Sequence, residues 1–219
     1  MTCTSVNDDS RLHSRAELGR LLDRARTDAG QSLGQLLELY RNYLKMLAFT
    51  QMDRQIQVRC SPSDVVQETF LEAHRDFGQF QGQGEGQFLA WLRKILANNL
   101  AHVFEKHVHA QRRSVRRELR LDGIGASLER STARLHAVLV GREDSPSAQT
   151  HEQEWAVILA DQLADLPADY RDVLVLRHLR GLPFKEVAEQ MDRTPGAVRM
   201  LWVRAIAEIR QRLNAKGLL

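Results

Sequence analysis

Cysteine, proline and long apolar runs are scarce in this sequence. The two cysteines, Cys3 and Cys60, give neither a disulfide framework nor a metal-binding spacing, which fits a reducing cytoplasm. No run approaches 18 consecutive apolar residues, so we expect no membrane insertion. The first nine residues, MTCTSVNDD, lack the basic segment followed by an apolar one that marks a secretory signal. These absences favour a cytoplasmic protein.

Alternation with a period of two is almost absent, whereas apolar residues recur every three or four positions. We therefore predict an all-α fold. A net charge of +3 is too small to identify a nucleic-acid partner. The positions of the charged residues along the chain are therefore more informative about a partner than the net charge. We expect two small helical domains joined by a flexible linker, with these boundaries: an N-terminal extension over 1–31, a first domain over 32–121, a linker over 122–153 and a second domain over 154–219.

The N-terminal extension contains one segment with a helical apolar face, 16–26, which either packs on the first domain or lies free of it. The first strong helix is expected from about Ser32 to Gln51, followed by a polar break over 52–59. Ser61 and Pro62 then have the residue types of a helix cap and a first helical position. The outer face of this next helix is acidic and polar, with one exposed leucine, which makes it either a solvated surface or a partner surface: Asp64, Gln67, Glu68, Leu71 and Glu72.

Four glycines between Gly78 and Gln87 indicate a mobile loop, and no strand or phosphate-binding motif accompanies them. The helix expected from Phe88 onward meets no proline or glycine before Gly123. Its first half is apolar and its second half is basic, which favours a nucleic-acid surface over a solvated tail or a lipid-bound helix. His102 and His109 share one face of this helix, but no carboxylate or cysteine joins them at a ligand spacing, so we predict no metal site.

The C-terminal part has the pattern of a helix-turn-helix. Ala188 supplies the small residue where two helices cross, Asp192 stands where the chain must turn through the left-handed region, and Thr194 and Pro195 begin the second helix. The second helix is expected to enter a DNA major groove. The residues left on or near its outer face are candidates for base and phosphate contacts: Arg193, Thr194, Gly196, Ala197, Arg199, Met200 and Arg204.

Three motifs in this order resemble the bacterial RNA polymerase sigma factors of the extracytoplasmic-function group. They are DVVQETFLEA (64–73), FLAWLRKILAN (88–98), and LPADYRDVL (166–174) followed by the helix-turn-helix. The resemblance covers about 32–213. It departs from the usual pattern at Pro183, in place of a polar cap, and at 200–202, in place of a more polar stretch.

The resemblance implies one role for each matching surface. Asp64, Gln67, Glu68 and Leu71 would dock on the clamp of the largest polymerase subunit, and the C-terminal recognition helix would read the −35 element as duplex. The loop and basic helix would hold the opened −10 element. The residues implied for the −10 contacts are Trp91, Lys94, Asn98, Asn99, Lys106, Arg112 and Arg113. Promoter DNA and core polymerase are the implied partners, no cofactor is implied, and whether an anti-sigma factor exists stays open.

Two other functional classes compete with this interpretation. A helix-turn-helix regulator that acts without polymerase would bind its promoter tightly as the free protein. An enzyme, such as a nuclease or a metal hydrolase, would need a cluster of carboxylates or histidines, and the sequence shows none at suitable spacings. We therefore expect a protein that is not an enzyme.

Overall fold

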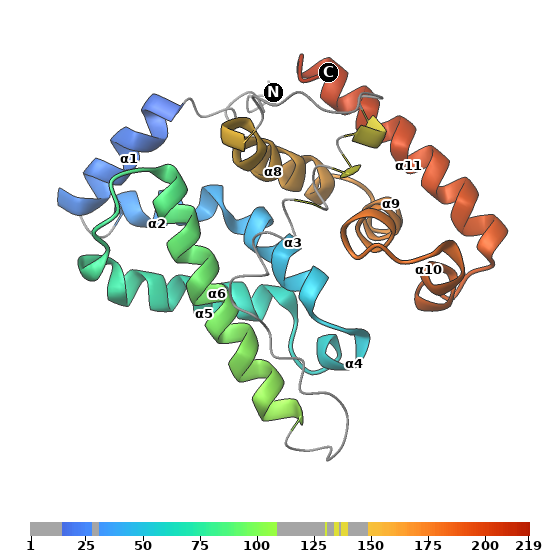
Figure 1. Cartoon of the computed structure of the whole chain (residues 1–219), viewed down its shortest axis with the longest axis horizontal. Coiled ribbons are helices and arrows are strands. Elements are labelled where there is room, and N and C mark those ends of the chain that lie inside the picture. The colour runs from blue at the N-terminus through green and yellow to red at the C-terminus, as the bar shows by residue number, and fades with distance from the viewer. Residues whose placement is uncertain (1–14, 28–30, 109–129, 131–133, 136, 140–148) are drawn as a thin grey trace, which may run out of the picture.

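The structure is a computed structural model that describes residues 15–27, 31–108, 130, 134–135, 137–139 and 149–219. The secondary structure of these residues is helical, as predicted, and no strand occurs among them. The helices form an N-terminal group, α1 to α6, and a C-terminal group, α8 to α11 (Figure 1). The N-terminal elements are α1 Arg15–Thr27, α2 Gln31–Leu39, α3 Arg41–Gln51, α4 Arg54–Gln57, α5 Pro62–Asp76, the 3-10 turn η1 Phe77–Gln79 and α6 Glu85–Val108. The C-terminal elements are α8 Gln149–Ala164, α9 Ala168–Leu174, the π-helical turn η2 Val175–Leu179, α10 Phe184–Gln190 and α11 Pro195–Ala215.

The N-terminal group has its core between α2, α3, α5 and α6, with α1 packed on α2 and α6. Leu22 and Ala25 of α1 are buried there, so this helix does not lie free of the domain. The expected single helix over 32–51 is wrong at Tyr40, which separates α2 from α3 with φ −99° and ψ 3°. Tyr40 is buried, and its hydroxyl donates to Glu85 Oε1 of α6 at 3.1 Å. The break therefore turns a core tyrosine toward α6.

The segment between α3 and α5 is not wholly polar. Met52 is fully buried, and Asp53 caps the short helix α4 by accepting from the Ile56 N–H at 2.9 Å. Helix α6 begins at Glu85, three residues before the predicted start. In the loop before it, Gly82 packs closely against the side chains of Phe80 and Gln87, so a larger residue at position 82 would force one of them to shift.

The two groups contact each other through α3, which packs on α8 and η2 as well as on its own domain (Figure 1). Asn42 of α3 donates to Asp161 Oδ1 of α8 at 2.8 Å, and both side chains are partly buried. A cavity of about 520 Å³ lies beside this bond, lined by residues of α3, α5, α8 and α9 that include Met46, Phe49 and Leu163. The two groups therefore touch, but the contact is incompletely packed.

Part of the expected linker is held against the C-terminal group. Leu135 and Leu139 are buried, and the Arg210 guanidinium of α11 donates to the carbonyl of Leu139 at 2.8 Å and to that of Val138.

In the part of the chain that the structure describes, none of the helices combines the length and the hydropathy that a membrane span needs. No group of three or more His, Cys, Asp or Glu side chains suited to a metal ion occurs within those same ranges.

Candidate nucleic-acid interface

Helix α5 begins with a capping box that fixes its acidic outer face. The Ser61 hydroxyl accepts from the Asp64 N–H at 3.2 Å, and Asp64 Oδ2 accepts from the Ser61 N–H at 2.8 Å. These hydrogen bonds, the one from the backbone above all, hold the pKa of Asp64 below its ordinary value. Gln67, Glu68 and Leu71 follow on the same exposed face, and Leu71 is 58% exposed. All four predicted residues thus lie together on one surface, while Asp64 also stabilises the helix start.

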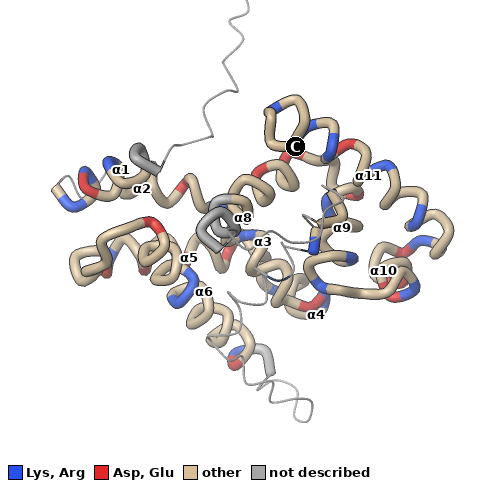
Figure 2. Tube along the Cα trace, turned by 45° about the horizontal axis from the view of Figure 1, so that its top comes forward, with Lys and Arg blue, Asp and Glu red and all other residues tan. Residues whose placement is uncertain are grey.

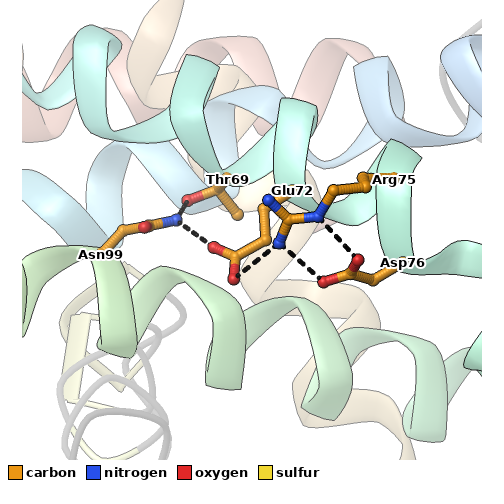
Figure 3. A network of polar contacts seen from close by, with 5 residues as sticks. All are labelled: Thr69, Glu72, Arg75, Asp76 and Asn99. Carbon is orange, nitrogen blue, oxygen red and sulfur yellow. Dashed lines mark hydrogen bonds and ion pairs between the residues drawn. The ribbon is translucent and has the colours of Figure 1, made fainter.

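The side of α5 next to this face is tied to α6 by a polar network, which includes Glu72, a residue that the sequence placed on the outer face (Figure 3). The Asn99 amide donates to Thr69 Oγ1 at 3.3 Å and to Glu72 Oε2 at 3.1 Å. Glu72 also pairs with Arg75 at 3.5 Å, and Arg75 pairs with Asp76. Asn99 is only 9% exposed. Its amide is directed into the domain, so Asn99 serves to cross-link the two helices and we leave it out of the DNA-binding surface.

The other residues predicted to contact the −10 element divide into three groups. Lys94 and Lys106 are exposed along α6, with Asn98 half-buried between them. Trp91 lies in an aromatic cluster, with its ring centroid 5.1 Å from that of Phe80 and 5.8 Å from that of Phe88. Arg112 and Arg113 lie outside the described residues. The structure therefore places the two lysines and Asn98 at separate points along α6 and packs the partly buried Trp91 against the core.

The helix-turn-helix has the predicted turn. Asp192 is the non-glycine residue with positive φ, 53°, among the described residues. The Arg193 N–H then bonds back to the Ala188 carbonyl at 2.9 Å, as in a Schellman motif. Thr194 caps α11 by accepting from the Ala197 N–H at 3.2 Å, and Ala188 is buried where α10 meets α11. These contacts fix the angle at which α11 leaves the domain.

The outer face of α11 carries both cationic and apolar side chains. Figure 2 marks the positions of the lysines and arginines along the trace of α11. Gly196, Ala197, Arg199 and Arg204 are exposed, and Met200 is 56% exposed. Arg193 is engaged with Asp169 of α9, with 2.6 Å between the guanidinium and the carboxylate. Sequence reasoning missed Val203, which is 51% exposed, although its spacing of three from Met200 would have placed it on this face. An exposed helix with arginines beside apolar groups suits a major groove, where guanine edges and thymine methyl groups are read.

A histidine pairs with a tryptophan behind this face. The Trp202 indole N–H donates to His178 Nε2 at 2.8 Å, which requires a neutral ring at that nitrogen. Burial, and to a smaller extent the charge of Arg177, lowers the pKa of His178 to about 4. His178 is therefore an uncharged structural acceptor near neutral pH.

The chain is similar in sequence to known proteins over most of its length. Residues 156–209, which span α8 to α11, match the family described as Sigma-70, region 4. The chain is 31% identical over 151 residues to an ECF RNA polymerase sigma-E factor of Haemophilus influenzae, covering 69% of this chain and 74% of that protein. It is also 31% identical over 142 residues to the protein of that name from Escherichia coli strain K12, covering 65% and 68%.

Among solved structures, the complex of CnrH with the cytosolic domain of CnrY shares 21% identity with the chain. The match covers 90% of this chain and 97% of the solved one, with a TM-score of 0.34. The assignment of the chain to a family therefore rests on its sequence relatives and not on this structural match.

Proposed function

The chain belongs to the extracytoplasmic-function group of RNA polymerase sigma factors, and we propose that α5, α6 and α11 divide its work among three surfaces. As a member of this family it binds core RNA polymerase and promoter DNA and directs transcription initiation. Sigma factors in general are not enzymes. We propose that this chain performs no chemical step of its own and works in the cytoplasm beside the polymerase.

The observation that supports the division most strongly concerns α11. The match to sigma region 4 covers the helix-turn-helix, and within that match the exposed residues of α11 are arginines, small residues and apolar groups. We assign α11 to the −35 duplex, with Thr194, Gly196 and Ala197 close to phosphates at the helix N-terminus. Arg199, Met200, Val203 and Arg204 are assigned to base edges and flanking phosphates. Arg193 reaches a phosphate only after it leaves Asp169.

The exposed face of α5 is assigned to core polymerase. Gln67 and Glu68 are exposed and lie beside the exposed Leu71. An apolar side chain within a polar, acidic surface is the arrangement that a protein interface uses, because the apolar group supplies burial and the charges supply orientation. Lys94, Asn98 and Lys106 on α6 are assigned to the opened −10 strand, together with Arg112 and Arg113 beyond the described residues.

The contact between the two helical groups affects how the two DNA-binding surfaces can reach the promoter. The −10 and −35 elements are centred about 25 base pairs apart, as their names state, which is about 85 Å of duplex at 3.4 Å per base pair. Contact through α3 and α8 holds the two reading surfaces at one separation and angle. We propose that core polymerase sets the separation required, helped by the incomplete packing of this contact. The free chain should then bind promoter DNA weakly.

Purified core polymerase tests the assignment of α5. Glu68→Lys should reduce co-purification with core at least tenfold, because it reverses a charge within the proposed interface. Asp23→Lys is the matched control: it reverses an exposed acid on α1 and should leave co-purification unchanged. Equal co-purification of the wild type and Glu68→Lys would contradict the assignment. Tight promoter binding by the free chain, with no association to core, would favour a regulator that acts alone.

A further inference from the structure

Phe184, the first residue of α10, lies between two arginines of the C-terminal group. The Arg177 guanidinium carbon is 4.8 Å from the centroid of the Phe184 ring, and that of Arg199 is 5.7 Å from it. Both distances fall within the range in which a guanidinium is attracted to the negative face of an aromatic ring. Phe184 therefore links a residue of η2 to an exposed residue of the recognition helix.

The Phe184 ring is itself held in place. The Trp202 ring meets it edge to face, with centroids 5.8 Å apart and an interplanar angle of 79°. Trp202 in turn is anchored by its hydrogen bond to His178. Arg177 is fixed on its own side by donating to the Leu182 carbonyl at 2.9 Å. The ring thus has a defined orientation before any DNA arrives.

We propose that Phe184 is a positioning residue for Arg199 in reading the −35 element, an inference that rests on the proposed function of α11. An exposed arginine on a helix samples many rotamers, and ordering it on binding DNA costs conformational entropy. Contact with a fixed aromatic face restricts those rotamers in the free protein. It also keeps the planar guanidinium in one orientation, which bidentate recognition of a guanine edge requires.

The other arginines near the start of α11 are placed differently. Arg193 is paired with Asp169, and Arg204 is exposed five residues after Arg199. A phosphate contact tolerates many arginine geometries, whereas a base contact tolerates few. Loss of the Phe184 ring should therefore lower discrimination at the base pair that Arg199 reads and leave general DNA affinity nearly unchanged.

The test uses holoenzyme assembled from core polymerase and the full chain, with promoter fragments that carry each single substitution in the −35 element. Arg199→Ala first identifies its base pair, as the position where preference falls about tenfold or more. Phe184→Leu should reduce preference at that same position three- to tenfold, and Phe184→Tyr should restore it. The double variant Phe184→Leu with Arg199→Ala should resemble Arg199→Ala alone. Combined with Arg204→Ala, the matched control, Phe184→Leu should act additively.

A fluorinated phenylalanine at position 184 separates packing from the attraction to the ring face. It keeps the shape of the side chain but removes the negative charge density of the face, so discrimination at the Arg199 base pair should fall while the helix content measured by far-UV circular dichroism stays the same. The fluorinated residue also tests the inference if the Phe184→Leu variant does not fold. A uniform loss of affinity across all −35 sequences, or unchanged discrimination with the fluorinated ring, would overturn the inference. A wild-type holoenzyme without any −35 preference would instead contradict the proposed function.

Discussion

Acidification from pH 7 to pH 4 should destabilise the C-terminal helices through His178. Its Nε2 accepts the Trp202 N–H, and burial lowers its pKa from 6.5 to about 4. Protonation removes the lone pair at Nε2, so Trp202 loses its acceptor and a positive charge is placed beside Arg177. The hydrogen bond and the neutral ring therefore stabilise the folded chain only while His178 is unprotonated.

The sign and the size of the effect follow from the two pKa values. Between pH 6.5 and pH 4 the unfolded chain binds more protons at His178 than the folded chain does, so the free energy of unfolding falls as the pH falls. The contribution is complete above about pH 6.5 and is lost progressively toward pH 4. The full difference in pKa corresponds to about 3 kcal/mol. Because the ring keeps part of its contact with solvent, we expect about 1–2 kcal/mol.

His178→Gln provides the comparison, since the glutamine oxygen can still accept from Trp202 but does not titrate. Urea unfolding followed by tryptophan fluorescence at several pH values gives the free energy of unfolding for both proteins. Carboxylates titrate in both and cancel, so between pH 7 and pH 4 the wild type should lose about 1–2 kcal/mol more than the variant. Parallel pH profiles, or an imidazole pKa above 6 for His178 in an NMR titration, would refute the reasoning.

Three further predictions concern single side chains. Asn99→Ala should lower the free energy of unfolding by about 1–3 kcal/mol, because Glu72 loses a donor in the α5–α6 network; equal urea midpoints would contradict the cross-linking role. Asp192→Val should cost about 1–2 kcal/mol by thermal unfolding, because a β-branched residue is strained at φ 53°, whereas Asp192→Gly should fold normally. Asn42→Asp places a second carboxylate beside Asp161, and the repulsion should separate the two helical groups. Energy transfer between dyes on α5 and α11 should therefore fall. Unchanged transfer would show that the bond between Asn42 and Asp161 does not hold the two groups together.

Local signals in the sequence predicted the starts of α5 and α11 and the helix-turn-helix well. The capping residues Ser61 and Thr194 each bond a backbone N–H three positions later, so a short stretch of sequence is enough to identify them. The turn at Asp192 is likewise local. These features fix where α5 and α11 begin and which of their faces are exposed. The candidate surfaces on those two helices could therefore be derived without a structure.

Features that depend on distant partners were missed. Asn99 has the polarity of a surface residue, but its partners Thr69 and Glu72 lie 30 and 27 positions earlier. Periodicity could not reveal the break at Tyr40, because the apolar pattern continues across it, and the Tyr40 hydroxyl bonds Glu85 of α6, 45 positions later. The buried Leu139 has its carbonyl bonded by Arg210, 71 positions later. In each case tertiary packing decided the outcome.

The central claim is tested most directly by transcription in vitro with purified core polymerase on a library of genomic DNA fragments, followed by sequencing of RNA 5′ ends. With the chain present we predict new start sites that share a −10 and a −35 element, and Arg199→Ala should reduce the use of sites with the preferred −35 sequence. Core polymerase that yields the same start sites with and without the chain, from a preparation in which the chain is folded, would contradict the account.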